Sequence, residues 1–265
     1  MNGRDKMPTK RLWEIGMSQE QVTIQATDGA CKAYVLTPDA SGDGAGPWPG
    51  VIFFMDAFGI RPGMIQMATH LASQGYVVLL PDLFYRHGPY GPLDPAEVLK
   101  GDFRAVIGPL MGSTDNHKAA EDSRAFIAYL DGRADVAEGK IGTVGFCMGG
   151  GMAITAAEYY PDRIGAAVSF HGGNLATDQP TSPHLLLNKV QGELYIAVAD
   201  NDQSYPPEMG ERFEAALKAA GVKYKTEFYA GKLHGWMKPD LPVYDAEAAE
   251  RGWSAALELY GRTLP

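Results

Sequence analysis

Short apolar runs alternate with helical patterns along most of this chain, and this alternation limits its fold more than any other feature. The runs include "VIFFM" at 51–55, "YVVLL" at 76–80 and "LYIAVA" at 194–199. Runs that are apolar at successive positions are typical of strands covered on both faces. Because segments with helical periodicity separate them, we expect a parallel sheet with right-handed crossovers.

The expected order begins with an alternating strand pair over 20–36 and continues as strand and helix units. Irregular stretches at 82–116 and 170–191 follow strands at the sheet edge where α/β sites lie, so we expect them to wall a pocket. The fold class is therefore α/β: one domain over 19–265 with a mostly parallel sheet of about eight strands and helices on both faces, preceded by an N-terminal arm over 1–18. Further expected strands cover 50–55, 76–80, 140–144, 164–169, 193–198 and 222–229, and expected helices cover 62–74, 117–131, 149–159, 207–220 and 245–262.

Composition narrows the possible partners. A net charge of −9 argues against nucleic acid or an anionic membrane surface as the main partner. The apolar runs are far shorter than the ~20 residues of a membrane-spanning helix. Two cysteines make a disulfide framework improbable and suit a reducing cytoplasm. Without a C-x-x-C pair, clustered metal ligands or a nucleotide-binding fingerprint, we expect no metal and no cofactor, and a small molecule as the partner.

The segment "VGFCMGGG" carries a possible nucleophile. Gly145, Cys147 and Gly149 form the G-x-Nuc-x-G pattern of a sharp turn between a strand and a helix, which many hydrolases use to present a serine. Buried cysteine is also a common small apolar residue in tight turns. The turn alone therefore leaves both interpretations open.

The residues after this turn favour catalysis. In the hydrolase order an acid and then a histidine follow the nucleophile. Of the histidines after the turn, His171 and His184 precede the next candidate acids, and only His234 follows them. Asp200 and Asp202 both lie at the end of the strand "ELYIAVA" and compete for the acid role. Acid and histidine thus follow two successive strands at the edge where the cysteine lies.

Two other classes compete with this interpretation. Glutamine amidotransferase relatives also carry cysteine in such a turn, but their histidine lies in H-x-E or directly after the cysteine, unlike "CMGGG" and "HGWMK" here. A non-catalytic relative that binds a small molecule is the second alternative.

Between about residues 20 and 262 the chain resembles the dienelactone hydrolase (carboxymethylenebutenolidase) family, which has the α/β-hydrolase fold. The motifs that carry the resemblance are "MDAFGI", "PDLFYR", "VGFCMGGG", "ADNDQSYP", "LHGW" and "PDLPVYDAEAAERGW". It implies a cysteine-nucleophile ester or enol-lactone hydrolase that forms a thioester. Aligning "ADNDQSYP" with the family's G-x-x-D-x-x-x-P selects Asp202 over Asp200.

The resemblance also implies the catalytic roles. Family members rest the protonated thiol against a carboxylate in an E-x-F-G setting, where this chain has "DAFG" and the shorter aspartate. The implied set is Cys147, Asp202 and His234 as the triad, Asp56 as the thiol-switch carboxylate, and the backbone N–H groups of Ala57 and Met148 as the oxyanion hole.

Substrate binding is implied at five further positions. Family type members hold the lactone carboxylate with two arginines; Arg86 matches the first, and Lys238 stands where the second would be. Lysine keeps the charge but lacks the planar fork of arginine. Tyr85, Trp236 and His171 are expected to line the same pocket.

Overall fold

A computed structural model describes residues 18–38 and 46–265, so the expected arm over 1–18 lies, except for its last residue, outside the described residues. The strands are β1 (Ser18–Ala26), β2 (Gly29–Thr37), β3 (Gly50–Phe54), β4 (Val77–Pro81), β5 (Ile141–Phe146), β6 (Ile164–Phe170), β7 (Glu193–Ala199) and β8 (Lys223–Tyr229). The helices are α1 (Pro62–Ala72), α2 (Pro95–Lys100), α3 (Phe103–Gly112), α4 (Asn116–Asp131), α5 (Met148–Tyr159), α6 (Pro207–Ala220) and α7 (Ala246–Thr263), with short 3-10 turns η2 (Pro183–Leu185) and η3 (Leu187–Lys189).

The described strands form one sheet in the order β1-β2-β4-β3-β5-β6-β7-β8. β1 pairs with β2, and β2 with β4, in antiparallel fashion, and the other neighbours are parallel. Every residue of β3, β4, β5 and β6 is buried, as expected for strands covered on both faces. The predicted α/β fold class with a mostly parallel sheet is therefore confirmed.

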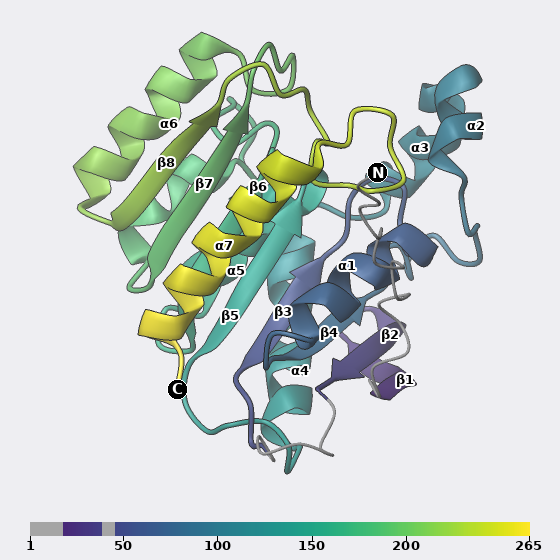
Figure 1. Cartoon of the computed structure of the whole chain (residues 1–265), viewed down its shortest axis with the longest axis vertical. Helices are drawn as coiled ribbons and strands as arrows, with labels where there is room; N and C mark the ends of the chain where they lie inside the picture. The colour runs from purple at the N-terminus through teal and green to yellow at the C-terminus, as the bar shows by residue number, and fades with distance from the viewer. Residues whose placement is uncertain (1–17, 39–45) are drawn as a thin grey trace, which may run out of the picture.

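Helices cover the two faces of this sheet (Figure 1). α1 and α7 lie on one face, where α7 packs on β6 and β7, while α4 and α5 pack together on the other. α5 is buried at most of its positions because it lies between the sheet and α4. This sandwich holds the ends of the parallel strands in fixed positions.

The carboxyl ends of five strands meet at one edge of the sheet, the upper edge in Figure 1. The residues that follow them closely are Asp56 after β3, Cys147 after β5, His171 after β6, Asp202 after β7 and His234 after β8. Five segments that are distant in the sequence thus bring reactive side chains to a common edge.

The stretch 82–116 differs from the expected irregular loop, because it contains α2 and α3. Asp94 and Asp102 cap these helices by accepting hydrogen bonds from Ala96 N (2.8 Å) and Ala105 N (3.0 Å). Both helices are short, and Pro109 lies inside α3, so their periodic signal is weak. The described residues include no helix long and apolar enough to cross a membrane.

Candidate active site

Cys147 lies in a sharp turn between β5 and α5, with a left-handed backbone (φ 56°, ψ −116°). This conformation is strained for a residue with a side chain and occurs preferentially at functional sites. The flanking glycines are needed for close approach. A Cβ on Gly145 would lie 1.8 Å from Gly149 O, and one on Gly149 would lie 2.3 Å from Phe54 O. The G-x-C-x-G pattern therefore folds into the predicted strand-turn-helix unit.

His234 is held by the second of the two competing aspartates. Its Nδ1 lies 2.6 Å from Asp202 Oδ2, and Ser204 donates to Asp202 Oδ1 from its backbone N (2.8 Å) and its hydroxyl (2.6 Å). Asp200 instead accepts from Gly231 N at 2.8 Å. Asp202 therefore orients the histidine, while Asp200 stabilises the loop before it.

The thiol and the imidazole form a coupled pair. Burial raises the pKa of Cys147, but the charge of His234, its hydrogen bond to the thiol and the charge of Lys238 together lower that pKa below its ordinary value. Burial lowers the pKa of His234, whereas Cys147 and Asp202 raise it to about 10. Both shifts favour a thiolate beside an imidazolium, the form in which cysteine is a nucleophile.

Two backbone N–H groups next to Cys147 have no acceptor among the described residues: those of Ala57 and Met148. Met148 N begins α5, where the helix dipole favours negative charge. Because Gly149 packs against Phe54 O, the start of α5 lies directly beside the segment after β3. The two donors thus lie on adjoining segments, as an oxyanion hole requires.

The oxygens of Asp56, the residue expected as the thiol-switch carboxylate, are occupied by donors other than the thiol. It is fully buried, and its oxygens accept hydrogen bonds from Phe58 N (2.9 Å) and from Arg61 Nη1 (2.7 Å) and Nη2 (3.0 Å). Lys238 Nζ lies 2.9 Å from Asp56 Oδ2. Four donors therefore occupy the carboxylate, which leaves no acceptor for the thiol. Burial raises the pKa of Asp56, but Lys238 and Arg61 outweigh it and keep the group ionised.

Arg86 and Tyr85 belong to a polar network centred on Asp122. Arg86 bonds to Asp122 with Nη1 (2.8 Å) and Nη2 (2.9 Å) and to Asp28 with Nε (2.6 Å). The Tyr85 hydroxyl donates to Asp122 at 2.9 Å, and the guanidinium stacks on its ring. The expected role of Arg86 in binding a substrate carboxylate is therefore not supported, because its guanidinium is already paired with fully buried Asp122 and with half-exposed Asp28.

Trp236 and His171 form a cluster of rings together with His234. Trp236 is fully buried and stacks on Tyr229 with ring centroids 4.6 Å apart, so it is a core residue and not an exposed pocket wall. His171 packs edge-to-face against both His234 and Trp236 at 5.0 Å. Burial, with the charges of His234 and Lys238, holds the pKa of His171 well below its ordinary value, so the ring is neutral.

A model of the dienelactone hydrolase family matches residues 31–264 of this chain. The chain belongs to the dienelactone hydrolase family. A carboxymethylenebutenolidase of Pseudomonas putida is 31% identical over 237 residues, 88% of this chain and 92% of the relative. A Synechocystis protein named as a candidate carboxymethylenebutenolidase is 27% identical over 253 residues, 92% of this chain and 96% of the relative.

Solved structures agree with the fold. The crystal structure of a candidate dienelactone hydrolase from Klebsiella pneumoniae superposes with a TM-score of 0.81 at 22% identity, covering 93% of this chain and 99% of that chain. As a member of the dienelactone hydrolase family, this protein is an ester- or lactone-cleaving hydrolase.

Four residues of this protein that form the ion pairs and hydrogen bonds described above were not identified from the sequence: Arg61, Asp240, Ser204 and Asp122. Arg61 bonds to Asp240 with Nε (2.6 Å) and Nη2 (3.2 Å), and its Nη1 donates a hydrogen bond to Asp56. Arg61 and Asp240 are 179 residues apart, so no local pattern signals their pairing. Ser204, two residues after the acid, had a usable signal, since such serines often bond to a preceding aspartate.

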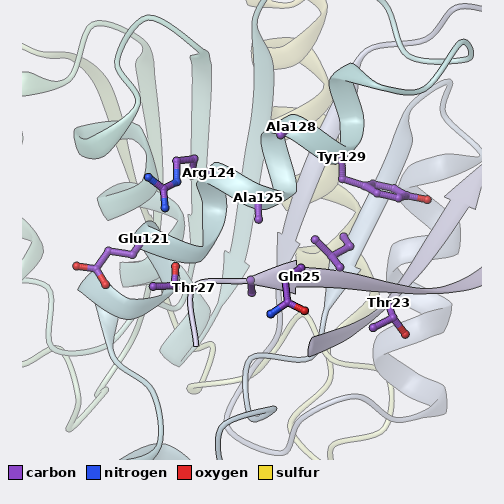
Figure 2. Close-up of a pocket in the computed structure, with 10 residues that line it drawn as sticks. Thr23, Gln25, Thr27, Glu121, Arg124, Ala125, Ala128 and Tyr129 are labelled. Atoms are coloured by element: carbon purple, nitrogen blue, oxygen red, sulfur yellow. The ribbon is translucent and has the colours of Figure 1, made fainter. Parts of the chain in front are cut away.

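Two hollows are found in the described part of the chain. One, of about 760 Å³, is lined by β1, β2, the start of α1 and the segment 82–92. The other, of about 620 Å³, lies between β1 and α4; Figure 2 shows Thr23, Gln25 and Thr27 opposite Glu121 and Arg124. Neither hollow is lined by Cys147 or by His234.

Proposed function

We propose that this protein is a cysteine-dependent hydrolase of carboxylic esters or enol lactones that works through a thioester. The observation that carries the proposal is the strained strand-to-helix turn that holds Cys147, together with the hydrogen bond between His234 and Asp202 and the opposite pKa shifts that Cys147 and His234 cause in each other. This is the arrangement of an activated nucleophile, a base and an orienting acid.

The proposed reaction has two halves. The Cys147 thiolate attacks the carbonyl carbon, and the N–H groups of Ala57 and Met148 hold the oxyanion of the tetrahedral intermediate. The C–O bond breaks, and the His234 imidazolium gives its proton to the departing alkoxide or enolate. The neutral imidazole then removes a proton from water, which attacks the thioester and releases the acid and the thiolate. Asp202 keeps His234 oriented in both halves.

Cys31 provides an internal control for the nucleophile. It is fully buried, and burial together with the nearby charge of Asp82 raises the pKa of its thiol. The two cysteines of one chain thus have opposite shifts, and thiolate is the reactive form.

Iodoacetamide should therefore label Cys147 much faster than Cys31. Because the pKa of Cys147 is lowered, its thiolate persists as pH falls below the ordinary cysteine value of ~8.5 and is lost only when pH falls through the lowered pKa. Labelling, followed by mass spectrometry of tryptic peptides between pH 5 and 9, should stay fast to a lower pH in the wild type than in His234→Ala.

Turnover of 4-nitrophenyl acetate tests the chemistry itself. Cys147→Ala should abolish hydrolysis, Cys147→Ser should be far slower because a hydroxyl is a much weaker acid than a thiol, and Cys31→Ser should retain wild-type kcat/KM. Retained turnover in Cys147→Ala would rule out the proposed nucleophile. Absence of turnover in the wild type towards all activated esters would favour the alternative of a binding protein.

A further inference from the structure

The positive charges beside the nucleophile are already neutralised by the chain's own carboxylates. Lys238 and Arg61 are 1% and 2% exposed, and both bond to Asp56. Arg61 uses its remaining donors on Asp240 and on Gly59 O (3.1 Å). Two cations thus face two carboxylates, and a substrate carboxylate could pair with Lys238 only by competing with an aspartate that Arg61 holds in place.

The third cation that could receive such a carboxylate is also occupied. Arg86 directs Nε, Nη1 and Nη2 to Asp28 and Asp122. This network carries one positive and two negative charges, so it repels an additional anion. Arg86 and Lys238 are therefore both already paired with carboxylates of the chain.

Two exposed aliphatic side chains lie on segments connected to the candidate triad. Leu233, directly before His234, is 50% exposed, and Leu185 on η2 is 49% exposed. Asn174 N donates to Ser204 O at 2.7 Å and His184 N to Leu175 O at 3.1 Å, so hydrogen bonds connect the segment bearing Leu185 to the acid loop. Two loops that follow different strands thus carry exposed aliphatic side chains.

α3 adds an aromatic side chain from the opposite direction. Phe103, 38% exposed, packs edge-to-face on Phe58 with ring centroids 5.9 Å apart. Lys238 Nζ and Arg61 Cζ lie 5.5 and 5.3 Å from the centre of the same Phe58 ring. Figure 1 shows α3 and the loop between β8 and α7 at the same edge of the sheet. The exposed Phe103 is therefore one aromatic contact away from the neutralised charge cluster.

We propose that the substrates of this enzyme are neutral esters with an apolar acyl group, and that an acyl chain ending in a carboxylate is disfavoured. The inference rests on the proposed cysteine hydrolase activity and specifies its substrate class. An apolar acyl group gains burial against Leu233, Leu185 and Phe103. A carboxylate in the same place would lose its hydration without gaining a free cation.

A matched pair of substrates tests the charge directly: 4-nitrophenyl hexanoate and the mono-4-nitrophenyl ester of adipic acid. They have the same leaving group and differ in whether the acyl chain ends in a methyl or a carboxylate. An unpaired charged group costs about 1.5–3 kcal/mol relative to a bonded one, so kcat/KM for hexanoate should exceed that for adipate by about tenfold to a hundredfold at pH 7. Equal values, or a preference for adipate, would overturn the inference.

Two single substitutions distinguish the effect of charge beside the nucleophile on the preference for hexanoate from the effect of charge elsewhere. Asp240→Asn leaves Arg61 with one carboxylate and adds a net positive charge beside Asp56, so the preference for hexanoate should narrow several-fold. Asp28→Asn removes one carboxylate from Arg86 in the same manner, away from the triad, and should leave the preference unchanged. Both side chains are partly exposed (26% and 55%), so both variants should fold. An unchanged ratio in Asp240→Asn would contradict the charge argument.

The same assay distinguishes failure of this inference from failure of the proposed function. If Cys147→Ala abolishes hydrolysis of both esters and the wild type prefers the adipate ester, only the proposed substrate class is refuted. Hydrolysis that survives in Cys147→Ala, or no hydrolysis of either ester, would refute the cysteine mechanism and this inference with it. Phe103→Ser should lower kcat/KM for hexanoate but not for 4-nitrophenyl acetate, whose acyl group is too short to use the ring. Equal losses on both esters would exclude the apolar contact.

Discussion

At the residue scale, two aspartates separated by one position have different surroundings. Asp202 bonds to His234 and Ser204, and its hydrogen bonds and the imidazolium keep its pKa lowered although burial opposes them. Asp200 bonds only to backbone N–H of Gly231 through its side chain. The difference follows from the loop after β7, which turns the later aspartate towards the histidine.

Asp202→Asn should therefore lower kcat/KM for 4-nitrophenyl hexanoate by about 10²–10⁴-fold, the usual contribution of positioned acid–base catalysis. Asp200→Asn should have a much smaller effect, because its partner is a backbone amide that an amide oxygen can also satisfy. Steady-state kinetics on both variants, with circular dichroism as the folding control, gives the ranking. A larger loss in Asp200→Asn would transfer the acid role to that residue.

At the scale of elements, one buried carboxylate joins three separate segments. Asp122 on α4 accepts from Thr27 N (3.1 Å) in the β1–β2 turn and from Tyr85 and Arg86 after β4. α4, the β1–β2 pair and the segment after β4 are therefore fixed to one another by a single side chain. A buried carboxylate left without its cation is strongly destabilising.

Arg86→Met should accordingly lower the free energy of unfolding by about 3–5 kcal/mol, as expected when one partner of a buried ion pair is removed. The fraction that stays folded should retain its preference for hexanoate over adipate, because Arg86 does not contact the triad. Urea denaturation measures the first quantity and the substrate pair the second. Arg212→Met is the control: its partner Asp178 is 92% exposed, so the change should be about 0–1 kcal/mol. A selective loss of adipate hydrolysis in Arg86→Met would show that Arg86 binds the substrate carboxylate.

At the scale of the whole molecule, an ionisable side chain is buried without a partner. Glu158 on α5 is 1% exposed, and its two oxygens have no hydrogen-bond partner among the described residues. Burial raises its pKa to about 8, and Thr155 and Lys189 only partly oppose this. The folded protein therefore keeps a proton on Glu158 near neutral pH that the unfolded chain releases at its ordinary pKa of 4.5.

Stability should depend on pH as a result. Between about pH 4.5 and 8 the folded state binds one more proton than the unfolded state, so Glu158 lowers the free energy of unfolding as pH rises through this window. Above about pH 8 it causes no further decrease. Glu158→Gln cannot ionise, so its Tm relative to that of the wild type should increase as pH rises from 5 to 9. Differential scanning calorimetry measures this difference. Glu258→Gln, at an exposed position of α7, is the matched control. A constant Tm difference across the range would exclude titration of Glu158.

Local patterns in the sequence were sufficient for the fold class and for the turn around Cys147, and they motivated the proposed order of acid and histidine. These depend on periodicity and on steric limits within a few residues, such as the close approach at Gly145 and Gly149. The helices α2 and α3 and the charge state of the site were not predictable in this way. Arg61, Asp240 and Asp122 acquire their partners from segments far away in the chain, and whether a cation is free depends on which carboxylates the fold buries beside it. The fold class and the turn around Cys147 were therefore determined by short motifs in the sequence, whereas the pairing of the positive charges with carboxylates was decided by the tertiary structure, because burial and long-range contacts together set the charge beside Cys147.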